Sequence, residues 1–225
     1  LDNDRDAVVG IVLQVLDVQV DDGVIFELGR LTAALIRDTE MYAGVRLAVP
    51  ARLDRAQVVL RLDVNVGDPV TPEPVAIDFP TLLAGSFRLL GYPLATVLAE
   101  KIITMIDRGA TTTRERDFAD ILLVTRRHPI DAKELRQALM ATALHRQSQQ
   151  RGLASLLDDL GLTRQRSWVA YLDRNGLSPQ LPSVYAEAID EVVAFADPLL
   201  NGVVTGGAWD PVGRTWMPAE SPGGS

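Results

Sequence analysis

Charged residues inside an apolar stretch are the first candidates for chemistry in this sequence. Glu100 and Lys101 lie at the centre of an otherwise largely apolar run from Val97 to Ile106, and Asp117 and Asp120 follow at helical spacing in the next run. Charges at buried positions are costly unless they are paired, hydrogen-bonded or open onto a polar cleft. The lysine and the two aspartates could therefore form a structural salt-bridge network or a functional site.

The choice of lysine favours the functional alternative. Of the 22 basic residues, only Lys101 and Lys133 are lysines, and all others are arginines. Lysine offers a compact ammonium group with a pKa that can shift, which arginine does not. A chain that uses arginine almost everywhere, but lysine at its most buried charged position, suggests a specific need for an ammonium group there.

Two helices joined by a short loop are predicted to position these charges. Pro93 suits the first turn of the first helix, and Gly109 follows its end, where a left-handed cap is needed. The second helix is predicted to begin near Thr113, a suitable N-cap. Because the two helices are expected to pack antiparallel, the lysine should lie near both aspartates.

Two arginines on the second helix are spaced to contact the same carboxylates. Arg114 precedes Asp117 by three residues, and Arg116 precedes Asp120 by four. Residues at these separations are neighbours on a helix surface.

A third carboxylate, Asp63, is predicted to lie on a strand. Residues 58–66 alternate between apolar and polar, which places Asp63 in the middle of the polar face. Polar residues on the open face of a sheet are ordinary. A carboxylate in this position is also how many nucleotidyl-transfer sites present a metal ligand.

The overall pattern predicts an α+β protein, with a mixed sheet in the N-terminal half and a helical C-terminal half. We expect a sheet region over residues 1–91, a helical region over 92–200 and an irregular tail over 201–225. Trp209 and Trp216 should hold that tail against the domain.

Composition excludes some classes of protein and suggests one partner. The chain has no cysteine, hence no disulfide and no thiolate metal site. No apolar run reaches the roughly 18 residues that span a membrane, and no signal peptide opens the chain, so we expect a cytoplasmic protein without a membrane partner.

The net charge is −8, yet residues 101–175 hold 13 basic and 9 acidic residues. This segment is either a footprint for a polyanion or an ordinary solvated surface.

Several stretches together resemble the AbiEii/AbiGii family of nucleotidyltransferase-fold toxins, which includes the MenT toxins of type IV toxin–antitoxin systems. The resemblance covers about residues 4–145. It rests on the order and spacing of DDGVIFE, IRDTEMYAGVRLAVPARLDRAQVVLRLDVNVGDPVTP, FPTLL and YPLATVLAEKIITMIDRGATTTRERDFADILLV. Membership would imply a nucleotidyltransferase-like sheet followed by helices, with Mg²⁺ and an NTP as cofactors.

The resemblance also implies roles for individual residues. Asp63 matches a carboxylate that binds magnesium, Lys101 matches a lysine that contacts nucleotide phosphate, and Asp117 matches an aspartate that completes the catalytic site. Further nucleotide contacts are expected from Asp120, Arg114 and Arg116. The acceptor implied by the family is RNA, at the tRNA 3′ end, for which segment 101–175 would be the binding surface through residues such as Arg126, Arg127 and Arg136. A cognate antitoxin encoded nearby is the implied protein partner.

The sequence departs from the family at its front. The paired aspartates of the first motif have no counterpart in the printed chain and should lie upstream of Leu1. Asp2 and Asp4 are not equivalents, because they lead into a helix. We therefore expect the chain as printed to bind nucleotide weakly through Lys101 without transferring it. The alternative is a non-catalytic nucleotide-binding or interaction protein, a truncated or degenerate relative of the toxins.

Overall fold

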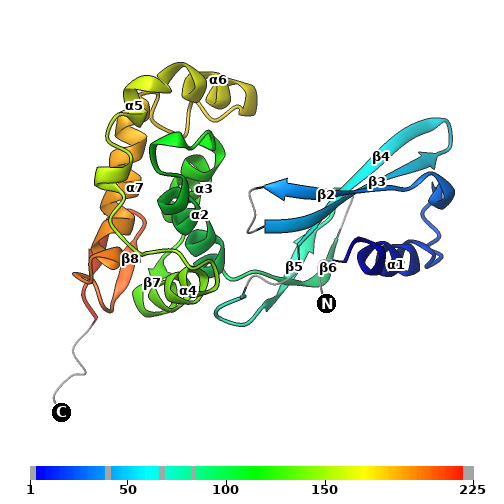
Figure 1. Cartoon of the computed structure of the whole chain (residues 1–225), viewed down its shortest axis with the longest axis horizontal. Coiled ribbons are helices and arrows are strands. Elements are labelled where there is room, and N and C mark those ends of the chain that lie inside the picture. Colours follow the sequence, from blue (N-terminus) through cyan, green and yellow to red (C-terminus); the bar gives the residue numbers. More distant parts are fainter. Residues whose placement is uncertain (1–3, 39–41, 66–68, 83–84, 220–225) are drawn as a thin grey trace, which may run out of the picture. The chain divides into compact units, whose positions relative to one another are not determined.

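The computed structural model describes residues 4–38, 42–65, 69–82 and 85–219. The chain divides into two compact units, residues 1–68 and residues 69–225 (Figure 1). The domain boundaries expected from the sequence stay a prediction.

The first unit is an antiparallel sheet with one helix. Its central strand β3 (Tyr42–Leu53) pairs along one edge with β1 (Val24–Phe26) and β2 (Thr32–Asp38), and along the other with β4 (Ala56–Asn65). A single 3-10 turn, η1 (Leu28–Arg30), connects β1 to β2. Helix α1 (Arg5–Leu16) begins at Asp4, whose side chain accepts a hydrogen bond from the backbone N–H of Asp6. The helix packs on β2 and β3.

The core of this unit confirms the expected alternation of β4 over residues 60–65, whereas Val58 and Val59 are both exposed and Val66 lies outside the described residues. Val45 and Leu47 of β3 are fully buried, and Leu62 and Val64 of β4 pack against them. The intervening Asp63 is exposed. Strand β2 was not predicted from the sequence. Its residues, TAALIRD, contain a continuous apolar run and lack the apolar/polar alternation that identifies a half-buried strand.

The second unit is mainly helical. It opens with a hairpin of β5 (Val75–Pro80) and β6 (Ser86–Gly91). The elements that follow are α2 (Leu94–Arg108), η2 (Gly109–Thr111), α3 (Glu115–Thr125), β7 (Ile130–Asp131), α4 (Ala132–His145), η3 (Ala154–Leu156), α5 (Leu160–Thr163), α6 (Gln165–Asn175), α7 (Tyr185–Leu200), β8 (Ala208–Asp210) and β9 (Thr215–Met217). The α+β class is therefore confirmed. All strand pairs in the described residues are antiparallel, so the sheets are not mixed.

Helix α2 lies at the centre of the helical core. Eight of its residues are buried, among them Leu98, Ile102 and Ile103. It packs against α3 and α4, while α7 packs against α3 and α5 (Figure 1). No helix in the described part of the chain is long and apolar enough to cross a membrane.

The tail is more regular than expected. Strands β8 and β9 form a hairpin that extends β7 into a three-stranded sheet. The indole N–H of Trp209 donates to the carbonyl of Thr125 at 2.8 Å, and that of Trp216 donates to the carbonyl of Phe195 at 2.9 Å. The two tryptophans thus hold the tail to α3 and α7, as expected; residues 220–225 lie outside the described part.

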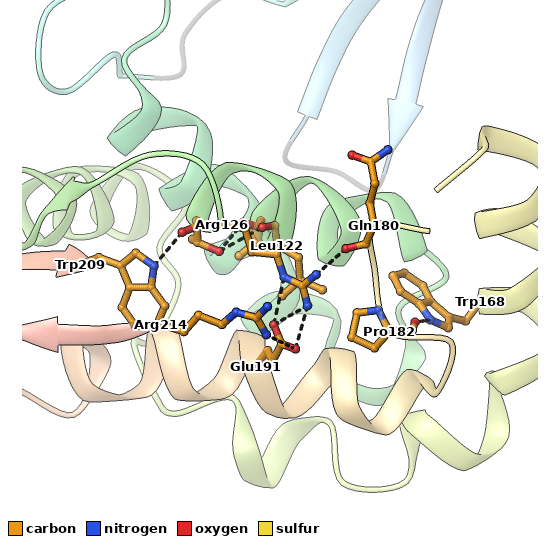
Figure 2. A network of polar contacts seen from close by, with 10 residues as sticks. Leu122, Arg126, Trp168, Gln180, Pro182, Glu191, Trp209 and Arg214 are labelled. Atoms are coloured by element: carbon orange, nitrogen blue, oxygen red, sulfur yellow. Dashed lines mark hydrogen bonds and ion pairs between the residues drawn. The ribbon is translucent and has the colours of Figure 1, made fainter. Parts of the chain in front are cut away.

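A polar network joins α3, α7 and the loop after α6 (Figure 2). The Arg126 guanidinium donates to both carboxylate oxygens of Glu191 and to the backbone carbonyl of Gln180. Arg214 donates to the same Glu191 at 3.2 Å. Arg136 likewise donates to backbone carbonyls near the end of α7. Arg126 and Arg136 therefore make internal contacts, and Arg127 donates to the side-chain oxygen of Gln180. The expected place of these three arginines on an RNA-binding face stays a prediction.

Replacing Arg126 should test this network. Arg126→Met leaves Glu191 with Arg214 alone and is expected to lower the free energy of unfolding by about 2 kcal/mol, the usual cost of losing hydrogen bonds to a charged group. Urea unfolding followed by circular dichroism measures the loss. Arg174→Met, at an exposed position of α6 outside this network, should change stability by no more than about 0.5 kcal/mol. Equal losses in the two variants would contradict the assignment.

Candidate functional site

Lys101 is held between two aspartates. Its ammonium nitrogen lies 3.0 Å from Oδ1 of Asp117 and 2.7 Å from Oδ2 of Asp120. The side chains are 18%, 11% and 30% exposed respectively, so the cluster is largely withdrawn from water but still reached by it. The structure therefore brings together the lysine and both helix aspartates, as predicted.

The local sequence explains how the two helices present these groups. Gly109 follows the end of α2, as expected, with a positive φ of 50°; its ψ of −140° differs from that of the left-handed cap predicted there. Helix α3 begins at Glu115 with Arg114 at its N-cap position and no side-chain cap hydrogen bond, which corrects the expected N-cap at Thr113. The hydroxyl of Thr112 accepts the backbone N–H of Arg114 at 3.4 Å. Asp117 consequently lies in the first turn of α3, where the helix dipole favours a carboxylate.

The electrostatic balance keeps Lys101 charged. Burial lowers the pKa of Lys101, but the hydrogen bond to Asp120 and the charge and hydrogen bond of Asp117 outweigh this effect, so the pKa lies above its ordinary value. The ammonium group is consequently positive at neutral pH and is fixed in direction by its two partners.

Of the two arginines expected nearby, Arg116 contacts the cluster. Its Nε lies 3.4 Å from Oδ2 of Asp120, and its side chain is 78% exposed. Arg114 occupies the N-cap position of α3 and is partly buried. Their role in binding nucleotide stays a prediction.

Asp63 has a partner of its own in the first unit. Arg46, opposite it on β3, donates from Nε and Nη2 to the two carboxylate oxygens, each at 2.7 Å. These hydrogen bonds lower the pKa of Asp63 below its ordinary value. The convergence of Asp63 with Lys101 stays a prediction, since the two residues belong to different units.

The carboxylates as arranged do not fit a preformed magnesium site. Mg²⁺ requires near-octahedral oxygen coordination. In residues 4–38, 42–65, 69–82 and 85–219, no three side chains of histidine, cysteine, aspartate or glutamate gather so that they could hold a metal ion. Asp63 is bound by Arg46, while Asp117 and Asp120 are bound by Lys101. Mg²⁺ binding stays a prediction.

Tyr171, on the helix that packs against α3, is a neighbour of this site that sequence reasoning missed. It lies on α6, which packs against α3. Burial raises the pKa of Tyr171, and the negative charge of Asp120 raises it further, while Arg116 and Lys101 oppose this effect. The available signal was the pair Trp168 and Tyr171, one helical turn apart in a chain with only 5% aromatic residues.

A second ion pair fastens α6 to the start of α3. Arg164 Nε donates to Oε1 of Glu115 at 2.9 Å, and Arg164 Nη2 binds the same oxygen. Glu115 is 7% exposed. Burial raises the pKa of Glu115, but hydrogen bonds from Ser167, the backbone and Arg164 outweigh it and bring the pKa below its ordinary value.

Comparison with known proteins identifies one family. The family described as "Nucleotidyl transferase AbiEii toxin, Type IV TA system" has a sequence model that matches residues 1–194. Searches of curated proteins and of solved structures returned no match. The matched range includes every residue of the lysine cluster, Asp63 and Tyr171.

The pair of Glu115 and Arg164 predicts a specific dependence of stability on pH. Since the folded-state pKa of Glu115 lies below its unfolded value of about 4.3, its stabilising effect is present above that pH and is lost as pH falls through the folded pKa. Glu115→Gln should therefore destabilise the protein at pH 7, and the difference from wild type should shrink in acid. Urea unfolding across pH measures this difference.

The matched control removes the partner instead. In an Arg164→Met background, Glu115→Gln should no longer destabilise the protein at pH 7, because the ion pair is already gone. A Glu115→Gln effect that stays constant from pH 7 into acid would contradict the prediction.

Proposed function

Because the chain belongs to the AbiEii family of nucleotidyltransferase toxins of type IV toxin–antitoxin systems, we propose that it transfers nucleotides from an NTP to an RNA acceptor, the 3′ end of tRNA. The reaction would take place in the cytoplasm with Mg²⁺ as cofactor. A toxin family of this kind implies an antitoxin partner, and we propose that it is encoded nearby.

The observation that carries the proposal is the fixed ammonium group of Lys101. In nucleotidyl transfer the acceptor hydroxyl attacks the α-phosphate of the NTP, and pyrophosphate leaves with its negative charge. A cation that is already oriented stabilises this charge without reorganising during the reaction. Asp117 and Asp120 supply the orientation, because both accept hydrogen bonds from the ammonium nitrogen. The protein's contribution would thus be to position a positive charge for the phosphates.

A second candidate function is nucleotide binding without catalysis. It is supported by the arrangement of the acidic residues: both oxygens of Asp63 are occupied by Arg46, and no cluster of three metal-ligating side chains occurs in the described residues. A degenerate relative of the toxins would retain Lys101 as a phosphate contact and lack transfer.

Substitutions of Lys101 should separate function from structure. Lys101→Met removes the cation and should weaken NTP binding by about 10- to 100-fold, in keeping with hydrogen bonds to charged groups. Lys101→Arg retains the charge, so it should preserve most of the stability but not the binding or transfer, because a guanidinium is larger and has a fixed planar geometry. Lys133→Met is the matched control, since Lys133 is the other lysine of the chain and is exposed on α4.

The measurements are calorimetric NTP binding and transfer of labelled nucleotide to total tRNA with magnesium, using the protein as its gene encodes it. Transfer that depends on Lys101 supports the toxin reaction. Binding without transfer favours the second candidate. Wild-type binding and transfer retained by Lys101→Met would reduce the cluster to a structural salt bridge and refute both functions for this site.

RNA binding is expected to depend on exposed arginines of segment 101–175. Arg116, Arg127 and Arg174 are exposed in this segment. Binding of tRNA should weaken steeply with salt, and replacing all three with alanine should reduce the slope of log K against log salt by about 2 to 3. Filter binding measures the slope. Alanine at the exposed Arg55, Arg61 and Arg88, outside the segment, should leave it nearly unchanged; an equal effect of both triple substitutions would refute the assigned surface.

A further inference from the structure

Four aromatic rings form a continuous column through the second unit. Phe118 of α3 meets Tyr185 of α7 edge to face at 5.3 Å, and Tyr185 stacks on Trp168 of α6 at 4.8 Å. Trp168 stacks in turn on Tyr171, with ring centroids 6.2 Å apart and an interplanar angle of 17°. Phe118, Tyr185 and Trp168 are at most 1% exposed. Tyr171 is partly exposed, so the column is open to solvent only at this end.

The open end of the column lies beside the lysine cluster. Tyr171 lies on α6, which packs on α3, the helix that carries Arg116, Asp117 and Asp120. The ion pair of Glu115 with Arg164 fixes α6 to the start of α3, and Trp168 donates its indole N–H to the carbonyl of Pro182 at 2.8 Å. The ring is therefore supported from behind by side chains that are themselves held in place.

We propose that the ring of Tyr171 is a stacking surface for a nucleobase whose phosphates are bound by Lys101. The inference rests on the proposed function, since it takes the ammonium group of Lys101 as the phosphate contact. Three observations support it: the column has one open end, that end is a flat ring with a rigid backing, and a fixed cation lies nearby. Stacking on an aromatic ring tolerates any base, because every base has a π face.

The nucleobase has two sources, the donor NTP and the terminal base of a single-stranded RNA. Both present the same chemistry to Tyr171, a planar base attached through ribose to phosphate. Inorganic tripolyphosphate has the phosphates without the base, and it therefore separates the contribution of the ring from that of Lys101.

The test compares Tyr171→Leu, which removes the ring, with Tyr171→Phe, which removes only the hydroxyl. Titration calorimetry measures the binding of each of the four NTPs, a short single-stranded RNA and tripolyphosphate. Tyr171→Leu should weaken binding of the stacked ligand by about 5- to 150-fold, whereas Tyr171→Phe should bind like wild type. Tripolyphosphate should bind equally to all three proteins. Val169→Ala, at an exposed position elsewhere on α6, is the matched control and should bind every ligand like wild type.

The pattern of losses identifies the ligand or overturns the proposal. A loss confined to NTPs assigns the donor base to Tyr171, and a loss confined to RNA assigns the acceptor base. The proposal is overturned if Tyr171→Leu leaves both ligands unaffected, if it weakens tripolyphosphate in parallel, or if Tyr171→Phe is as impaired as Tyr171→Leu. If Tyr171→Leu does not fold, Tyr171→Trp decides, because a larger ring should retain binding and a weakened variant contradicts stacking.

The Lys101→Met variant distinguishes a failure of the stacking proposal from a failure of the proposed function. If Lys101→Met loses binding of tripolyphosphate and NTP while Tyr171→Leu binds both like wild type, the assignment of Lys101 as the phosphate contact is supported. The stacking proposal alone is then refuted. A wild-type protein that binds no NTP and no RNA refutes both.

Discussion

The burial of one ammonium group between two helices is the constraint on which the second unit depends. Helix α2 buries eight residues in the core, and Lys101 is a charge on its partly buried side. A charge withdrawn from water is tolerated when opposite charges and hydrogen bonds compensate the lost solvation. Asp117 and Asp120 provide this compensation, and they can do so only if α3 lies with this face against α2. The ion pairs therefore specify the register of the two helices as well as a site.

Contacts between residues far apart in the sequence hold α3, α6 and α7 together. Glu115 binds Arg164, Phe118 lies against Tyr185, and Tyr185 stacks on Trp168. Each contact joins α3 to α6 or joins these helices to α7. A cation and a ring that are held by their neighbours would lose little entropy if a ligand bound, which is consistent with the proposal that the protein positions groups for nucleotidyl transfer.

In the first unit, Asp63 has a different environment from Asp117 and Asp120. Asp63 is exposed and pairs with Arg46 on the neighbouring strand, where solvent screens the interaction. An exposed, paired carboxylate can exchange its arginine for another cation at smaller cost than a buried one could. The aspartate carboxylate of the first unit is thus more available to another cation than those of the second unit. The sequence alone does not reveal this difference.

The sequence by itself determined the features that arise from local interactions. Alternation placed Asp63 on the polar face of β4, Gly109 ended α2, and helical spacing put Asp117 and Asp120 on one side of α3 near Lys101. Tertiary structure decided the partners. Arg46 pairs with Asp63, Glu191 pairs with Arg126, Tyr171 ends a column of aromatic rings on α6, and the tail folds into β8 and β9. Local patterns depend on backbone geometry repeated over a few residues, whereas these partners lie many residues apart in the chain and meet only when the core packs.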